Sequence, residues 1–244
     1  MMEIFDTHCH LADPKIYPKH KEVIKRAKDN GVTRILTIGY DDKTNDLSIK
    51  IAQKNEGVWA AVGIHPNESY DKEIILSLEE KVVAVGETGL DYYRNNTDRD
   101  TQIERFLKHI SIARSRNLPI IIHTRKAFPD AIMIVKEEKY PNGVFHCFSG
   151  NCDDARKIID LGFYISFSGS LTYGSTRLSQ VLKSIPTDRI LFETDSPYLS
   201  PIRSEMNEPK NVVKIIEYAS NVLGVAVEEL ALINTENGRR LFAI

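Results

Sequence analysis

The chain has 244 residues and a net charge of −2; 42% of its residues are hydrophobic and 27% are charged. These values are ordinary for a globular protein with a sizeable core, and they exclude a largely disordered chain. No run of eighteen apolar residues occurs, so we expect no transmembrane helix. A protein that binds long duplex DNA through its own cations is clearly basic. This chain is not, so any contact with phosphate must be local.

The N-terminus and the cysteines bear on location. The first residues lead directly into a strand-like segment, without a basic region and an apolar stretch, so no signal peptide is expected. Cys9, Cys147 and Cys152 leave one cysteine over and suggest no disulfide framework. We therefore expect a reducing, cytoplasmic setting and no membrane partner. The sequence leaves the oligomeric state open and is compatible with a monomer.

Apolar, strand-like runs alternate with amphipathic, charge-rich segments along the chain. Strands are expected at residues 3–7, 34–38, 58–63, 82–86, 119–122, 144–146, 163–167 and 189–193. Helices are expected at residues 19–30, 44–54, 69–79, 98–116, 126–139, 153–161, 175–184, 209–223 and 227–242. Gly31, Gly57 and Gly162 stand between a helix and the next strand, where a helix C-cap belongs.

Eight strand–helix repeats in about 250 residues are typical of a (β/α)8, or TIM, barrel. The strands are nearly continuous apolar runs, as in a parallel sheet covered on both faces. An open, doubly wound parallel sheet is the alternative, because it would give a similar pattern. No linker or repeat divides the chain, so we expect residues 1–244 to form one α/β domain.

Chemically capable side chains gather at the C-terminal ends of the expected strands, where a TIM barrel has its active site. Five of the seven histidines lie there, whereas His20 and His109 fall in expected helices and look like surface residues. The residues at these strand ends are His8, His10, His65, Glu87, His123, Arg125, His146, Glu193 and Asp195.

This set predicts a metal site, since imidazoles and carboxylates suit Zn²⁺, Mn²⁺, Fe or Co, and carboxylates also suit Mg²⁺. Six candidate ligands are too many for one catalytic ion with open positions and suit two ions bridged by a carboxylate. We expect Glu87 to bridge, and Asp195 to bind one ion and accept a proton from water. The six ligands are His8, His10, Glu87, His123, His146 and Asp195.

Three neighbours of these ligands are not counted among the six. Glu193 has the same strand parity as Asp195, so it either supports a ligand from behind or pairs with an arginine. Cys9 and Cys147 stand next to ligands but on the opposite face, and we expect both to pack rather than to bind metal.

Six motifs in a fixed order resemble the TatD family of metal-dependent deoxyribonucleases, part of the metallo-dependent hydrolase superfamily. The resemblance runs from Asp6 to about Pro209 and is carried by Phe5-Asp6-Thr7-His8-Cys9-His10, Gly63-Ile64-His65-Pro66, Gly86-Glu87-Thr88-Gly89-Leu90-Asp91, His123-Thr124-Arg125, His146-Cys147-Phe148-Ser149-Gly150 and Glu193-Thr194-Asp195-Ser196-Pro197-Tyr198-Leu199.

The resemblance implies a metallo-hydrolase barrel that cleaves phosphodiester bonds of DNA with two divalent ions, Mg²⁺ in activity with Zn²⁺ or Mn²⁺ as alternatives. It implies short or single-stranded DNA as the substrate, often trimmed from 3′ ends. It also implies the same six ligands and puts His65 beside the substrate phosphate. Arg125 and Arg203 are further candidates for phosphate contacts.

The chain departs from the family after Ser200-Pro201. Members usually carry a basic, glycine-containing loop there, whereas this chain has Ile202-Arg203-Ser204-Glu205-Met206 with a single cation. The aromatic residues Tyr92, Tyr93, Phe148 and Tyr198 fall in strand-end loops, where each could stack on a base or pack within its loop.

Two other functions fit the same residues. A metal-dependent esterase or amidohydrolase, such as an aminoacyl-tRNA deacylase, would use the same ligands, because metal-activated water attacks carbonyl carbon as well as phosphorus. A non-catalytic barrel that binds a partner would have a degraded ligand set, which this chain lacks.

Overall fold

The computed structural model describes residues 3–94 and 96–244, and in these the expected strands form one eight-stranded parallel sheet. Its order is β1 to β8, each strand pairing with the next along the chain. A doubly wound sheet would reverse its strand order near the middle. The strands are β1 (Ile4–Cys9), β2 (Val32–Ile38), β3 (Val58–Val62), β4 (Val82–Asp91), β5 (Ile120–Arg125), β6 (Gly143–Phe145), β7 (Tyr164–Phe167) and β8 (Ile190–Phe192).

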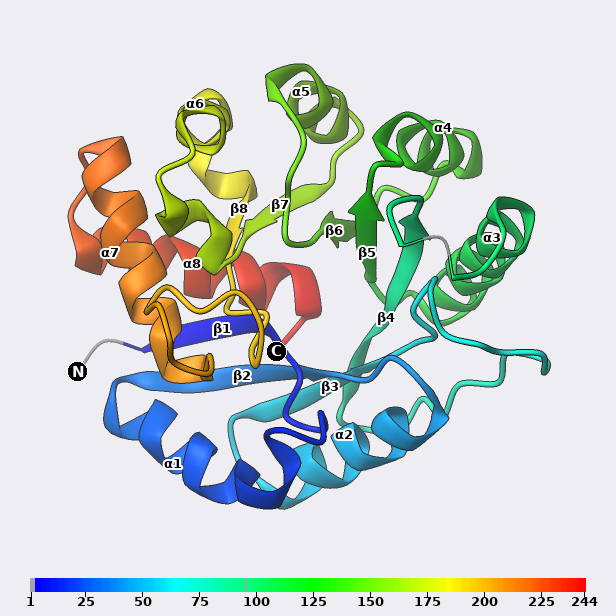
Figure 1. The fold of residues 1–244 in the computed structure, drawn as a ribbon, viewed down its shortest axis with the longest axis horizontal. Helices are drawn as coiled ribbons and strands as arrows, with labels where there is room; N and C mark the ends of the chain where they lie inside the picture. Colours follow the sequence, from blue (N-terminus) through cyan, green and yellow to red (C-terminus); the bar gives the residue numbers. More distant parts are fainter. Residues whose placement is uncertain (1–2, 95) are drawn as a thin grey trace.

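Helices surround this nearly closed barrel (Figure 1). They are α1 (His20–Asp29), α2 (Asp42–Lys54), α3 (Arg99–Arg116), α4 (Phe128–Glu138), α5 (Cys152–Asp160), α6 (Thr176–Ser184), α7 (Val212–Leu223) and α8 (Val227–Phe242). Short 3₁₀ turns are η1 (Tyr17–Lys19), η2 (Gly169–Tyr173), η3 (Thr187–Arg189) and η4 (Pro209–Asn211). None of the helices in the described residues is both long and apolar enough to cross a membrane.

Local sequence accounts for several helix ends. A capping box between Asp41 and Thr44 begins α2, and the Asp98 carboxylate accepts a hydrogen bond from the Thr101 N–H at the start of α3. The three glycines expected as C-caps have positive φ angles, as that position requires.

The helix expected at residues 69–79 is wrong. These residues connect β3 to β4 without forming a helix or a strand. Ile74 is buried, Ile75 is 76% exposed, and Leu76 and Leu78 are partly buried against the core. The pattern therefore has a period of two, which suits an extended chain lying over the barrel and not a helix.

The expected surface position of His109 is also wrong, because the ring is fully buried within α3. Its Nε2 accepts a hydrogen bond from the Ile64 N–H at 3.0 Å, and its Nδ1–H donates to the Arg105 carbonyl at 2.7 Å. His109 thus fixes the backbone directly before His65. His20 is partly exposed at the start of α1.

The C-terminal helix α8 covers the seam between β1 and β8. The Asn234 side-chain amide donates to the Phe5 carbonyl at 2.8 Å, and its oxygen accepts from the Phe192 N–H at 2.8 Å. Gly238 lets the helix approach closely, since a Cβ there would lie 2.5 Å from the Phe5 ring. Asn234 therefore supplies hydrogen bonds that a regular ladder between the first and last strands would form.

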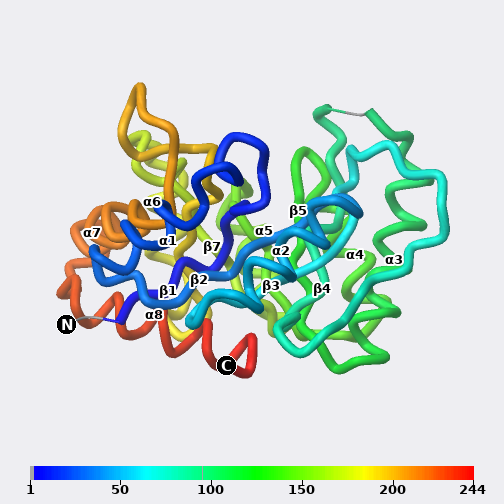
Figure 2. The backbone as a smooth tube through the Cα atoms, turned by 90° about the horizontal axis from the view of Figure 1, so that it is seen from below, coloured from blue at the N-terminus to red at the C-terminus, as the bar shows by residue number. Residues whose placement is uncertain are grey.

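Backbone bonds join the same seam at its other end: the Asp195 N–H donates to the His8 carbonyl at 2.9 Å and the His10 N–H to the Ser196 carbonyl at 2.8 Å. Seen from the side, the loop after β8 projects from one end of the barrel and α8 lies at the opposite end (Figure 2). The barrel interior is packed with apolar side chains, including Leu241 and Phe242 from α8, so it is a core and not a pore.

Candidate metal centre

Glu87 lies buried at the centre of the strand-end side chains. Its Oε1 is 2.8 Å from both His123 Nδ1 and His146 Nε2. Its Oε2 is 3.6 Å from His10 Nε2 and 3.7 Å from His8 Nε2. Each carboxylate oxygen thus faces a different pair of imidazoles, which is the arrangement expected of a bridging ligand.

The first half-site consists of His8, His10 and Asp195 around Glu87 Oε2. The two Nε2 atoms lie 3.3 Å apart, and Asp195 Oδ1 lies 3.3 Å from His10 Nε2 and 3.8 Å from His8 Nε2. Ligand atoms about 2.0–2.2 Å from one cation stand roughly 3.0–3.6 Å apart, so the two 3.3 Å spacings fit a divalent ion and the 3.8 Å spacing is slightly wider. His10 Nδ1 is hydrogen-bonded to the Ile38 carbonyl at 3.1 Å, which turns Nε2 toward the site.

The second half-site consists of His123 and His146 around Glu87 Oε1. Their facing nitrogens, Nδ1 and Nε2, lie 3.4 Å apart, and His65 Nε2 lies 3.7 Å from the same oxygen. The His146 ring stacks on the His8 ring with centroids 4.0 Å apart and planes 4° from parallel. This stack holds the two half-sites against each other.

Glu193 supports His146 from behind and pairs with no arginine in the described chain. Its Oε1 lies 3.3 Å from His146 Nδ1 and accepts the Cys147 N–H at 2.7 Å, while Oε2 accepts the Ser166 hydroxyl at 2.6 Å. Of the two roles that the sequence left open, the supporting one agrees with this geometry. Fixing the outer nitrogen of a ligand histidine orients the ring.

Asp91 is a residue that the sequence interpretation missed. Its Oδ2 lies 3.3 Å from His123 Nε2 and accepts the Asn67 side-chain amide at 2.7 Å, while Oδ1 accepts the Tyr93 and Arg94 N–H groups. These hydrogen bonds hold the pKa of Asp91 below its usual range against the opposing effect of burial. The sequence did contain a signal for Asp91. It lies four residues after Glu87 on the same strand, and residues an even number apart on a strand point to the same face.

Burial and mutual charges shift the pKa values of the clustered ligands in both directions. Burial opposes ionisation of Glu87, but nearby imidazoles, His146 first, outweigh it and lower the carboxyl pKa. Burial and then His123 lower the pKa of His65 to about 3, and burial and then His146 lower the pKa of His8. Burial also opposes protonation of His10, His123 and His146, but hydrogen bonds and charges from the neighbouring carboxylates outweigh it and raise the pKa of all three rings. A divalent cation bound there would take the place of these protons, because only the neutral imidazole binds metal.

Two observations test whether these residues fit the predicted ions. Buried or partly buried imidazole nitrogens and carboxylate oxygens converge within 4.8 Å in overlapping groups, His8–His10–Glu87 and His65–Glu87–His123 among them. No lysine or arginine forms an ion pair with the central carboxylates of Glu87 and Asp195 in the described residues. A donor set of nitrogen and oxygen whose acidic centre no lysine or arginine neutralises fits divalent cations.

A pocket of about 690 Å³ lies over this cluster. His65 and Arg125 line it, whereas Arg203 lines a smaller neighbouring pocket. Cys9 is buried as expected, but Cys147 borders the pocket, 3.1 Å from the Ser168 hydroxyl. Neither cysteine belongs to the convergent groups.

The four aromatic residues proposed to stack on bases differ in how far their side chains are exposed. Phe148 is buried and packs edge-on against Phe128 and Phe167, so it is not available to stack on a base. The Tyr92 hydroxyl donates to Asp130 at 2.8 Å within a partly buried loop. Tyr93 and Tyr198 are 62% and 43% exposed; only Tyr198 lines the pocket.

Strand-end imidazoles and carboxylates on a (β/α)8 barrel define the class of metal-dependent hydrolases. The family model described as "TatD related DNase" matches residues 5–243, and the chain belongs to this family. It is 41% identical to the "uncharacterized metal-dependent hydrolase YcfH" of Escherichia coli K12, covering 100% of this chain and 97% of that protein.

It is 30% identical to the "3′-5′ ssDNA/RNA exonuclease TatD" of Klebsiella pneumoniae, covering 99% and 98% of the two chains. Among solved structures, it resembles the TatD homolog YjjV of Escherichia coli K12 with a TM-score of 0.92 and 26% identity, covering 99% of this chain and 98% of that chain. The predictions of a TIM barrel, of the TatD family and of a metal-dependent hydrolase are confirmed.

Proposed function

We propose that this protein is a two-metal phosphodiesterase that removes nucleotides from the 3′ ends of single-stranded DNA. The observation that carries the proposal is the position of Glu87, with one oxygen toward each half-site. The family and the exonuclease name of the Klebsiella relative support a nucleic acid substrate.

Each half-site would bind one of the two ions. His8, His10 and Asp195 would hold one, His123 and His146 the other, with Glu87 shared. Two divalent ions bound there would stabilise negative charge on a phosphoryl group and lower the pKa of a nearby water. The Asp195 side chain is 14% exposed against 5% for Glu87, so it is the carboxylate within reach of pocket water and the proposed proton acceptor.

Cations around the pocket favour a polyanionic substrate. Arg94 and Arg125 line it, and neither forms an ion pair with a carboxylate in the part of the chain that the structure describes. His65 lies beside Glu87 at the edge of the second half-site. We propose that His65 and Arg125 contact non-bridging oxygens of the scissile phosphate, as guanidinium and imidazole N–H groups do in other phosphate sites.

The test is a cleavage assay with 3′- and 5′-labelled single-stranded DNA over a series of Mg²⁺, Mn²⁺ and Zn²⁺, with a chelator control. Glu87→Gln keeps the size of the side chain but removes its charge, and it should lower kcat/KM by about a hundredfold or more. Glu137→Gln, on the exposed face of α4, is the matched control. Metal analysis should give two ions per wild-type chain and fewer in Glu87→Gln.

Two results would count against the proposal. Undiminished cleavage by purified Glu87→Gln would exclude the bridging role. Turnover of an aminoacyl ester, assayed in parallel, without cleavage of DNA would replace the nuclease by the esterase alternative.

A further inference from the structure

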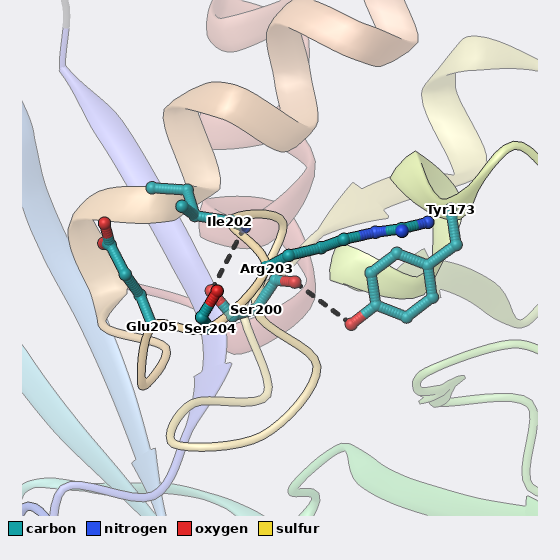
Figure 3. A pocket seen from close by; sticks show the side chains of 6 residues that line it. All are labelled: Tyr173, Ser200, Ile202, Arg203, Ser204 and Glu205. Atoms are coloured by element: carbon teal, nitrogen blue, oxygen red, sulfur yellow. Dashed lines mark hydrogen bonds between the residues drawn. The ribbon is translucent and has the colours of Figure 1, made fainter.

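A second pocket, of about 390 Å³, opens beside the metal centre. Figure 3 shows its lining: Tyr173 from η2, and Ser200, Ile202, Arg203, Ser204 and Glu205 from the loop after β8. This loop is the segment in which the chain departs from the family pattern.

The two pockets are consecutive along the rim of the barrel. Ser170 of η2 lines the metal pocket, and Tyr173, three residues later, lines the second one. Residues i and i+3 share one face of a 3₁₀ helix and lie about 6 Å apart along its axis. The loop after β8 also borders both pockets, because Leu199 lines the first pocket and Ser200 lines the second. The two pockets share no lining residue, but both are lined by η2 and by the loop after β8, so they lie next to each other.

The walls of the second pocket are braced against each other. The Tyr173 hydroxyl donates to the Ser200 carbonyl at 3.1 Å. A Cβ on Gly169 would lie 1.8 Å from the Leu199 carbonyl oxygen, so η2 and the loop touch through their backbones. The pocket is therefore formed before a ligand arrives, which lowers the entropic cost of binding.

Tyr173 offers an open aromatic face. The side chain is 52% exposed. Arg125 lies over the exposed ring of Tyr93 at 4.0 Å and Lys15 over that of Tyr198 at 5.0 Å. No cation or second ring covers Tyr173 among the residues that the structure describes.

Arg203 brings the only positive charge to the lining of this pocket. Its side chain extends toward Tyr173 (Figure 3), and it forms no ion pair in the described residues although Glu205 lines the same pocket. An open aromatic face together with an unpaired guanidinium matches the two parts of a nucleotide, a base to stack and a phosphate to bind.

We propose that the Tyr173–Arg203 pocket is a nucleotide subsite that binds a nucleotide adjacent to the scissile phosphate of a single strand. Tyr173 stacks on its base and Arg203 contacts its phosphate. The identity of the strand rests on the proposed function. The subsite does not require base pairing or a particular sequence, because every base has a face to stack.

The test compares two substrates and one ligand. The substrates are a single-stranded DNA about ten nucleotides long and bis(p-nitrophenyl) phosphate, a phosphodiester that contains no nucleotide. The ligand is the same DNA with phosphorothioate linkages and a fluorescein label, whose binding is followed by anisotropy over a range of salt concentrations. The variants are Tyr173→Ala, Tyr173→Phe and Arg203→Ala, with Arg116→Ala at the exposed end of α3 as the charge control.

Tyr173→Ala should weaken DNA binding about tenfold or more and lower the ratio of DNA to small-ester kcat/KM by a similar factor. Tyr173→Phe, which keeps the ring, should recover most of that loss. Arg203→Ala should reduce the slope of log K against log salt by about 0.7, and Arg116→Ala should not.

Equal losses on both substrates would overturn the subsite, since they would indicate a structural role. Unchanged DNA binding by Tyr173→Ala would overturn it as well. If the wild type binds DNA through Tyr173 and Arg203 but cleaves no phosphodiester, the proposed function fails and the subsite stands. If it cleaves DNA with no loss in Tyr173→Ala, the function stands and the subsite fails.

Discussion

His109 should make the stability of this barrel depend on pH. Both ring nitrogens are used in the neutral form, since Nε2 accepts the Ile64 N–H and Nδ1–H donates to the Arg105 carbonyl. A proton on Nε2 would remove the acceptor and place a charge in the core. Burial accordingly lowers the pKa of His109 from 6.5 to about 4.

The direction of the change in stability with pH follows from proton uptake. Above pH 6.5 the His109 ring is neutral in both the folded and the unfolded chain. As the pH falls from 6.5 toward 4, the unfolded chain binds a proton that the folded chain does not, so stability is lost. With about 1.36 kcal/mol per pKa unit, the loss from this one group is about 2 kcal/mol at pH 5.

The assay is urea unfolding followed by circular dichroism at pH 7.5 and pH 5, with chelator present to remove effects of metal binding. His109→Gln keeps a neutral donor and acceptor but does not titrate. The free-energy advantage of the wild type over this variant should be about 2 kcal/mol smaller at pH 5, since other titrating groups cancel in the difference. An advantage that is equal at the two pH values would refute the reasoning.

Three further predictions concern the seam, the metal support and the rim. Asn234→Leu leaves the Phe5 carbonyl and the Phe192 N–H without partners, so it should lower the free energy of unfolding by about 2–4 kcal/mol in urea titrations. Glu193→Gln should weaken metal affinity about 10–100-fold, measured by isothermal titration calorimetry. Gly169→Ala forces the loop at Leu199 to shift, so it should weaken binding of labelled single-stranded DNA while far-ultraviolet dichroism is unchanged.

Each of these three predictions has a control variant or an outcome that would contradict it. Asn30→Leu, at the exposed end of α1, should change stability by less than about 0.5 kcal/mol, and an equally small effect of Asn234→Leu would argue against the bridge. Metal affinity that is the same in Glu193→Gln as in Glu137→Gln would exclude the supporting role. Undisturbed DNA binding by Gly169→Ala would show that the loop adapts without cost.

The barrel was predictable because buried parallel strands are apolar along their whole length and helices alternate with them. Strand ends were less predictable. β4 continues to Asp91 and β5 to Arg125, beyond the expected ends at Gly86 and Ile122. Polar ligands such as Glu87 looked like terminators, although their backbones continue in the sheet.

The errors share one physical cause: long-range packing decided the outcome. Residues 69–79 are apolar enough for a helix, but they reach β4 as an irregular segment. His109 looked like one more polar residue on a charged helix, and only its bond to Ile64, 45 residues away, makes it a core residue. The partners of Asp91 and Asn234 likewise lie on other elements, so no local pattern reveals their roles.

The seam between β1 and β8 has a consequence for how the chain is made. The first half-site combines His8 and His10 from the first strand with Asp195 after the last, and Asn234 joins the strands that hold them. A ribosome makes these parts at opposite ends of the chain, so the emerging β1 has an open edge until α8 is synthesised. Chains released before Asn234 would expose that edge and lack the side chain that joins the two strands of the first half-site.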